Sequence, residues 1–236
     1  MRSRTRTAVA AVVLAMAVGG APPVARAGAS PGPDQARLAA VKARGDAAVS
    51  ARLATLAAAT GLIGSAVDLG PGERSALSNL VSGQQSGLTA LRSTIDGDTT
   101  VAQAVADVES IVTSYRVYVL TAPKVHLVIA ADRGAAAAAG LTGVVASLRE
   151  AIAAEQGAGR DVAAAQAGLA RLTTEVAAVS VAVGQVPGEV LPLTPAGYPA
   201  NRATLVAAAG SMAPAHQDLV QAVQLAHRII VELGGS

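Results

Sequence analysis

The chain must build its core almost without aromatic side chains. It contains no Phe and no Trp and only three Tyr, whereas 57 of its 236 residues are Ala. Alanine is the best helix former and buries little apolar area, so this composition favours long helices that approach one another closely along thin seams of Leu and Val. The predicted fold class is all-α: an elongated antiparallel helical bundle with a long coiled-coil hairpin.

Apolar residues recur at helical spacing from Asp34 onward. Asp34 follows two prolines and is placed to cap a first helix over about 34–67, which a Gly-Pro-Gly segment ends. A second helix follows, with Gln84 as the one polar residue of its apolar seam. Thr99 or Thr100 can then cap a third helix.

The clearest pattern lies at about 122–185. A stripe of Leu, Val and Ile repeats at spacings of four and three, breaks at a Gly-Ala-Gly turn that ends at Gly159, and then resumes. Two apolar stripes that flank a tight glycine turn predict an antiparallel hairpin with arms over about 122–156 and 160–185.

A helix boundary is expected where this hairpin begins. Pro123 fits the first turn of a helix that Thr121 caps, because the missing N–H of proline does no harm there. Val117 to Leu120 could alternatively form a short strand, although no partner strand of similar quality is present in the sequence.

Prolines also mark the end of the hairpin. The segment 187–199 is rich in proline and predicts a crossing that is not helical throughout and could carry the chain back along one arm. Asn201 is then expected to cap a last helix over about 201–233. Gly210 and Pro214 predict a kink in that helix or its division into two shorter ones.

The first 27 residues have the layout of a secretory signal peptide. Three arginines precede an apolar run of about eleven residues, and Ala25-Arg26-Ala27 is typical of a cleavage site. We therefore expect a secreted, extracytoplasmic protein that begins near Gly28 and forms a single helical domain over 28–236. The apolar run is shorter than the roughly 20 residues that a membrane-spanning helix needs, so no stable transmembrane anchor is expected after cleavage.

Charge and cysteine content exclude two classes of chemistry. The chain has 18 basic and 16 acidic residues, and the signal peptide contains four arginines and no acid, which leaves 14 and 16. These charges are scattered singly rather than gathered in a basic patch, so nucleic acid is not an expected partner. The chain has no cysteine, so disulfide bonds and thiolate chemistry are excluded.

One dense group of potentially reactive side chains surrounds the expected boundary at Pro123. A phenol, an imidazole and an Asp–Arg pair could meet there in a cleft between helices and bind a small polar ligand. The alternative is a crowded, packed corner in which the two tyrosines are bulky core fillers and a structural ion pair forms among Arg116, Asp132 and Arg133. The candidate binding residues are Tyr115, Arg116, Tyr118, His126, Asp132 and Arg133.

No metal site, cofactor or catalytic residue is expected. His216 and His227 are eleven residues apart, or roughly 16 Å along one helix, which is too far for both to bind one zinc ion. The sequence has no Gly-x-Ser-x-Gly turn and no glycine motif for phosphate binding. We therefore expect a protein that is not an enzyme.

Two segments carry a resemblance to a known group of proteins. Residues 114–133 (SYRVYVLTAPKVHLVIAADR) and 193–202 (LTPAGYPANR), with the heptad-like region between them, resemble alanine-rich secreted helical proteins of actinobacteria. The resemblance covers most of the chain after the signal peptide. It implies export and a helical, coiled-coil-like architecture, and it implies no activity.

Two functions follow as hypotheses. The first is an exported, non-enzymatic helical scaffold or partner-binding protein of the cell envelope, whose partner is another protein or an envelope component and which could form a homo-oligomer. The second is a helical bundle that binds a small apolar or lipid ligand, because alanine-rich packing leaves gaps. Its cavity would be lined by Val117, Tyr118, Leu120, Val125, Leu127, Val128 and Ile129.

Overall fold

The protein is all-α. A computed structural model describes residues 32–235, and within this range it contains six α-helices and no strand. The predicted signal peptide and its cleavage site lie outside the described residues. The helices are α1 (Pro33–Ser65), α2 (Pro71–Gly97), α3 (Val101–Thr113), α4 (Ala122–Gly157), α5 (Ala163–Val190) and α6 (Asn201–Gly235).

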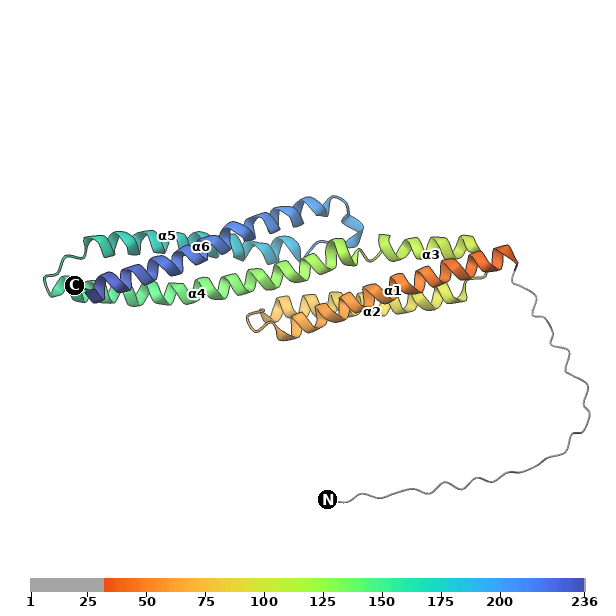
Figure 1. Cartoon of the computed structure of the whole chain (residues 1–236), viewed down its shortest axis with the longest axis horizontal. Helices are drawn as coiled ribbons and strands as arrows, with labels where there is room; N and C mark the ends of the chain where they lie inside the picture. Colours follow the sequence, from red (N-terminus) through yellow and green to blue (C-terminus); the bar gives the residue numbers. More distant parts are fainter. Residues whose placement is uncertain (1–31, 236) are drawn as a thin grey trace, which may run out of the picture.

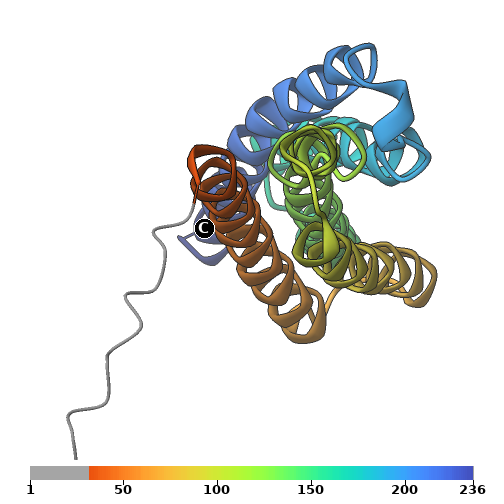
Figure 2. The ribbon, with the colours of Figure 1, turned by 90° about the vertical axis from the view of Figure 1, so that its right-hand side faces the viewer.

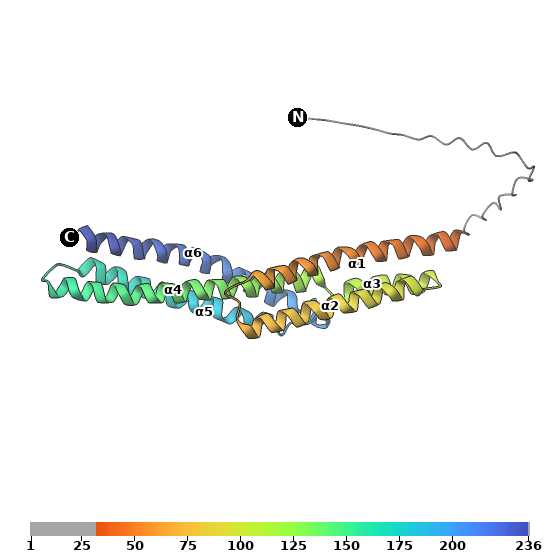
Figure 3. The ribbon, with the colours of Figure 1, turned by 90° about the horizontal axis from the view of Figure 1, so that it is seen from below.

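The helices form two three-helix bundles that follow one another along the long axis of the molecule (Figure 1). The first bundle consists of α1, α2 and α3, and the second consists of α4, α5 and α6. Figure 3 shows the same division from below, and Figure 2 shows the helices from the end that carries α1 and α3. The chain is therefore elongated, as its thin apolar seams predict.

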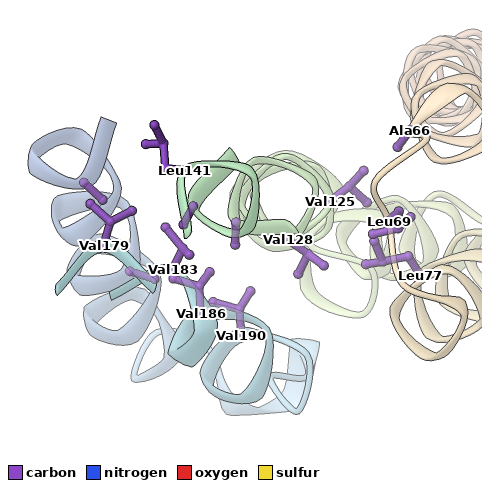
Figure 4. Packing of buried hydrophobic residues seen from close by; sticks show 14 of the residues in the cluster. Ala66, Leu69, Leu77, Val125, Val128, Leu141, Val179, Val183, Val186 and Val190 are labelled. Atoms are coloured by element: carbon purple, nitrogen blue, oxygen red, sulfur yellow. The ribbon is translucent and has the colours of Figure 1, made fainter. Parts of the chain in front are cut away.

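One continuous hydrophobic core runs through both bundles. Val125 of α4 is directed toward Ala66 and Leu69 in the α1–α2 connection, whereas Val128 lies on the side of α5 near Val190 (Figure 4). The core contains Leu, Ile, Val and Ala side chains only. Gly45 of α1 lets α3 pack tightly against it, because a Cβ at this position would lie 2.8 Å from Cγ2 of Val108.

The predicted hairpin is present as α4 and α5, which pack antiparallel. The arms, expected over about 122–156 and 160–185, span Ala122–Gly157 and Ala163–Val190. Gly159 adopts a φ of +79° in the turn, a conformation that favours glycine, and Arg160 forms an ion pair with Glu155 at 2.8 Å beside it. The predicted stripe is buried along both arms. Its supercoiling as a coiled coil stays a prediction.

Helix starts follow local rules with two corrections. Thr100 caps α3, and its side chain and that of Gln103 form a reciprocal capping box. The first helix, however, begins at Pro33, so Asp34 lies in its first turn and is not the cap. Thr121 does not cap α4 either, because its backbone is already helical.

The α4 helix begins at Ala122, where the predicted arm begins, but a π-helical turn precedes it. Arg116 adopts the left-handed conformation, with φ of 49°, and ends the run of α3. Residues Val117–Thr121 then form a π-helical turn that continues into α4, so the alternative of a strand there is wrong. Pro123 lies in the first turn of α4 as predicted, where its missing N–H leaves no donor unpaired.

The end of the second bundle also differs from the prediction. The α5 helix continues through Pro187 to Val190, so the crossing is shorter than 187–199 and does not run back along an arm. The α6 helix continues through Gly210 and Pro214 and is not divided. Buried side chains on both sides of these positions, among them Leu205, Ala208, Ala215 and Ile229, hold α6 in the bundle.

Candidate functional site

The six candidate residues do not gather in one cleft. Tyr115 packs against α2, where its hydroxyl lies 2.6 Å from the position that a Cβ on Gly87 would take, and burial raises the pKa of its phenol. Tyr118 is half exposed, and the guanidinium carbon of Arg52 lies 5.0 Å from its ring centroid. The two tyrosines therefore contact different neighbours, and neither borders a shared cavity.

Arg116 and Asp132 also point to different partners. The guanidinium carbon of Arg116 lies 4.6 Å from the ring centroid of Tyr198, in the connection before α6. One carboxylate oxygen of Asp132 accepts a hydrogen bond from the backbone N–H of Gly70 at 3.2 Å, at the start of α2. The expected ion pair between Arg116 and Asp132 is not formed among the described residues.

Asp132 lies in an acidic neighbourhood. Burial raises the pKa of its carboxyl group, the Gly70 N–H opposes that change, and the carboxylates of Glu73 and Asp68 raise the pKa further. Asp132 therefore fastens the α1–α2 connection to α4 through one hydrogen bond, in a place where its charge is unfavourable. This contact is structural, because it joins two elements of the bundles.

The remaining two candidates, His126 and Arg133, border a surface groove between α4 and α6. The groove consists of two hollows of about 620 and 820 Å³ that follow one another along the seam between these parallel helices. We call them together the α4–α6 groove. The first hollow is lined by Val119, Pro123, His126, Leu127, Tyr198, Arg202, Leu205, Val206 and Ala209; the second by Ala130, Arg133, Gly134, Ala137, Val183, Met212, Ala213, His216, Leu219, Val220, Val223 and Gln224.

Small residues of α4 create the groove. Ala130 and Ala137 are too short to reach α6, and Gly134 lets Val183 of α5 approach so closely that a Cβ there would lie 3.0 Å from its Cγ1. Val183 thus forms part of an apolar floor, while α6 contributes the exposed side chains of Val220 and Val223. A groove with these walls offers apolar contact along several helical turns.

The charged residues of the groove have one sign: Arg133 lines one hollow and Arg202 the other, and His126 and His216 lie beside them. No Asp or Glu lines either hollow, and none of the four forms an ion pair within the described part of the chain. The groove is therefore apolar inside and cationic at its rim.

Most of the residues predicted to line a cavity for a small apolar ligand lie in the core. Val117, Leu120, Val125 and Val128 are packed with 1% exposure or less and line neither hollow of the groove. Leu127 does line the groove, from the neighbouring face of α4. The signal that could have located the groove is the row of Val residues on α6, which a bundle of three helices leaves uncovered.

Three buried polar residues connect the elements; sequence reasoning named Gln84 and Thr121 without these contacts and missed Lys124. Gln84 of α2 accepts a hydrogen bond from the Thr121 hydroxyl at 2.9 Å and donates one to the Tyr115 carbonyl at 3.0 Å. Lys124, with 2% exposure, donates from Nζ to the carbonyls of Leu191 and Leu193 at 3.0 and 2.5 Å. Burial lowers the pKa of this ammonium group. These contacts leave none of the three open to a ligand.

Metal chemistry finds no support in residues 32–235, where no group of three or more His, Asp or Glu side chains is placed to hold an ion. His126 and His216 lie in separate hollows of the groove.

Three helical stretches are long and apolar enough to cross a membrane by length and composition: Pro33–Ser65, Val101–Gly157 and Ala163–Val190. Their Leu, Ile and Val side chains largely face the core.

Comparison of the chain with protein-family models, with curated proteins and with solved structures finds no match.

Proposed function

We propose that the protein is an exported, non-enzymatic scaffold of the cell envelope that binds a protein partner in the α4–α6 groove. Export rests on the signal-peptide pattern of residues 1–27. The binding role rests on one observation, the apolar groove with its cationic rim. The groove lies at the surface of the second bundle, and most of its walls are side chains that the bundle leaves uncovered.

The form of the groove favours a helix as the bound element. The groove is an open trough between two parallel helices, so an occupant has one side in the trough and the other in water. An amphipathic helix satisfies both sides, because its apolar face fits between α4 and α6 and its polar face remains hydrated. Docking would complete a four-helix arrangement in the second bundle.

A second candidate function is the binding of a small apolar ligand. The volume of the larger hollow, about 820 Å³, falls within the range of small-molecule sites, and its lining is largely Ala, Val, Leu and Met. An alkyl chain in an open trough would, however, keep one side in contact with water. A protein helix is therefore the better occupant.

We place the helices outside the bilayer although three of them are apolar enough to cross it. Their apolar character derives in large part from Ala, and their larger apolar side chains contribute to the packed core of the bundle. Insertion of one helix would expose the core contacts of its neighbours. Extraction of the envelope fraction with alkaline carbonate is expected to release the protein.

Site-specific crosslinking tests the proposed function. A photo-reactive residue at Val223, in the groove, is expected to capture an envelope protein, whereas the same residue at exposed Val181 on α5 captures none. Ala137→Trp fills the groove without entering the core and is expected to abolish the adduct. Equal adducts at both positions, or adducts that Ala137→Trp leaves unchanged, contradict the proposal. Native mass spectrometry of the same protein tests the second function, since a ligand that Ala137→Trp displaces would support it.

A further inference from the structure

Two α-helices of the described chain present more than one exposed large hydrophobic side chain. One is α6, which borders the groove. The other is α3, in the first bundle, where Val105 and Val112 are 39% and 47% exposed. These two valines lie two helical turns apart on the outer face of α3, together with exposed Ala residues. The molecule thus carries two separate uncovered apolar surfaces, one in each bundle.

The charges on the two surfaces are opposite. The only charged residues of α3 are Asp107 and Glu109, and Glu109 is exposed on the same face as Val105 and Val112. Neither carboxylate forms an ion pair within residues 32–235. The groove offers basic side chains alone, among them exposed Arg133. Contact between the two surfaces would pair each sign with its opposite.

The spacing of the residues also agrees. On α4, Arg133 lies three residues after Ala130 and four before Ala137, and all three line the groove. On α3, read in the opposite direction, Glu109 lies three residues from Val112 and four from Val105. An antiparallel α3 in the groove would therefore bring its two valines over the two small alanines, with the carboxylate opposite the guanidinium.

We propose that α3 of a second copy of this chain docks in the α4–α6 groove. This proposal rests on the proposed function and identifies the partner helix. Within one molecule α3 packs against α1 and α2 at the far end from α5 and α6 (Figure 3), so it cannot reach its own groove. The contact is heterologous: each copy offers α3 to one neighbour and its groove to another, and copies join head to tail into rings or filaments.

Other occupants fit the charges less well. Pairing of two α6 helices would place the cationic rim of one copy against that of the other. The N-terminal 27 residues carry four arginines and no acid, so they do not match the groove either.

Sedimentation velocity of the protein purified from an exporting host tests the proposal. We expect the average mass to rise with concentration between about 1 and 500 µM and to fall when salt is added, because charge pairs contribute to the contact. Glu109→Arg and Arg133→Glu each replace an exposed side chain, and each is expected to weaken association about tenfold or more. Glu150→Arg, on an exposed position of α4 outside the groove, is the matched control and leaves association unchanged.

Mixing the variants distinguishes a head-to-tail contact from any other. Glu109→Arg keeps the wild-type groove and Arg133→Glu keeps the wild-type α3, and the two introduced charges are also opposite in sign, so an equimolar mixture is expected to regain association with the two variants alternating, although neither variant associates by itself. The double variant carries both reversals and is expected to regain assembly beyond the dimer. Circular dichroism and thermal unfolding confirm that each variant is folded.

Three results would overturn the proposal: a protein that is monomeric throughout, a closed dimer that Glu109→Arg leaves intact, and a mixture of the two variants that does not associate. A monomer whose groove still crosslinks specifically to another envelope protein would remove this inference and leave the proposed function standing. A monomer without groove-specific adducts would remove both.

Discussion

Thr121 donates its hydroxyl hydrogen to Oε1 of Gln84 across 2.9 Å, and this buried bond links the two bundles. Thr121 ends the π-helical turn before α4, whereas Gln84 lies in the middle of α2. Gln84 uses its other end as well, since its Nε2 donates to the Tyr115 carbonyl at 3.0 Å. The two residues thus hold the segment between the bundles in place.

Replacement of Gln84 by Leu is expected to lower the free energy of unfolding by about 1–3 kcal/mol, because the Tyr115 carbonyl and the Thr121 hydroxyl lose their partner inside the protein. Urea denaturation measures the effect. Thr121→Val should lower the free energy of unfolding less in the Gln84→Leu background than in the wild type, because Gln84→Leu has already removed the bond that the two residues share. Gln221→Leu, on the exposed face of α6, is the control and should change stability by less than about 0.5 kcal/mol. Additive losses would contradict a shared bond.

Lys124→Met is expected to loosen the connection between α5 and α6. Lys124 Nζ donates to the carbonyls of Leu191 and Leu193, and no other side chain of residues 32–235 is seen to bond to either. Amide hydrogen exchange over residues 191–200 should therefore accelerate in this variant. Lys42→Met removes the other lysine of the chain, which donates to the Asp96 carbonyl at 2.7 Å, and should leave exchange in that connection unchanged.

The same lysine predicts a change of stability at alkaline pH. Burial lowers the pKa of Lys124 in the folded state below its ordinary value of 10.5, so the unfolded state binds more protons between the two values. The free energy of unfolding gains a favourable contribution from Lys124 as pH rises through this interval. Lys124→Met should lack that contribution and Lys42→Met should keep it. Identical profiles for both variants would show that Lys124 is not desolvated.

Asp132→Asn is expected to leave stability at pH 7 equal to or above that of the wild type. The amide oxygen can still accept from the Gly70 N–H, while the charge that faces Glu73 and Asp68 is removed. Burial raises the pKa of Asp132 in the folded state above its ordinary value of 3.8, so the folded state binds more protons than the unfolded state between these two pKa values. The free energy of unfolding of the wild type therefore rises as pH falls through the raised pKa, and the contribution of Asp132 is constant below pH 3.8. The difference between variant and wild type should therefore shrink in acid. Thermal unfolding against pH measures it, and exposed Asp96→Asn should show no comparable trend.

Two glycines of α1 should respond in opposite ways to alanine. A Cβ on Gly45 would lie 2.8 Å from Cγ2 of Val108, a stiff β-branched side chain, so Gly45→Ala is expected to cost about 1–3 kcal/mol. A Cβ on Gly61 would meet nothing within 4 Å, so Gly61→Ala is expected to raise stability by up to about 1 kcal/mol. Denaturant unfolding of both variants compares them directly. A loss at Gly61 as large as at Gly45 would contradict the packing.

The elements that sequence predicted well are those that depend on neighbours along the chain. The hairpin arms came within a few residues of α4 and α5, because apolar periodicity and a glycine turn are local signals. Thr100 was one of two expected caps, and it forms the capping box with Gln103. The last helix begins at Asn201, as predicted, but Asn201 is its first helical residue and not its cap, and its side chain donates to the Thr194 carbonyl at 2.6 Å.

The candidate site was dispersed because closeness in sequence does not give closeness on a helix. Arg116 itself adopts the left-handed backbone conformation, and its guanidinium group packs on the ring of Tyr198, more than eighty residues later in the chain. Asp132 and Arg133 are adjacent, but about 100° separates them around α4, so one faces the start of α2 and the other borders the groove.

The sequence by itself determined that the protein is helical, that its helices are long and that their seams are thin, because propensity and periodicity act within a few residues. The tertiary structure alone decided which faces stay uncovered. The groove exists where Ala130, Gly134 and Ala137 fail to fill the space beside α6, and α3 exposes its valines because only two helices cover it. The groove and the exposed valines of α3 both depend on how much side-chain volume is brought to one place by segments that are far apart in the sequence. Patterns within a few residues of the chain do not report that volume.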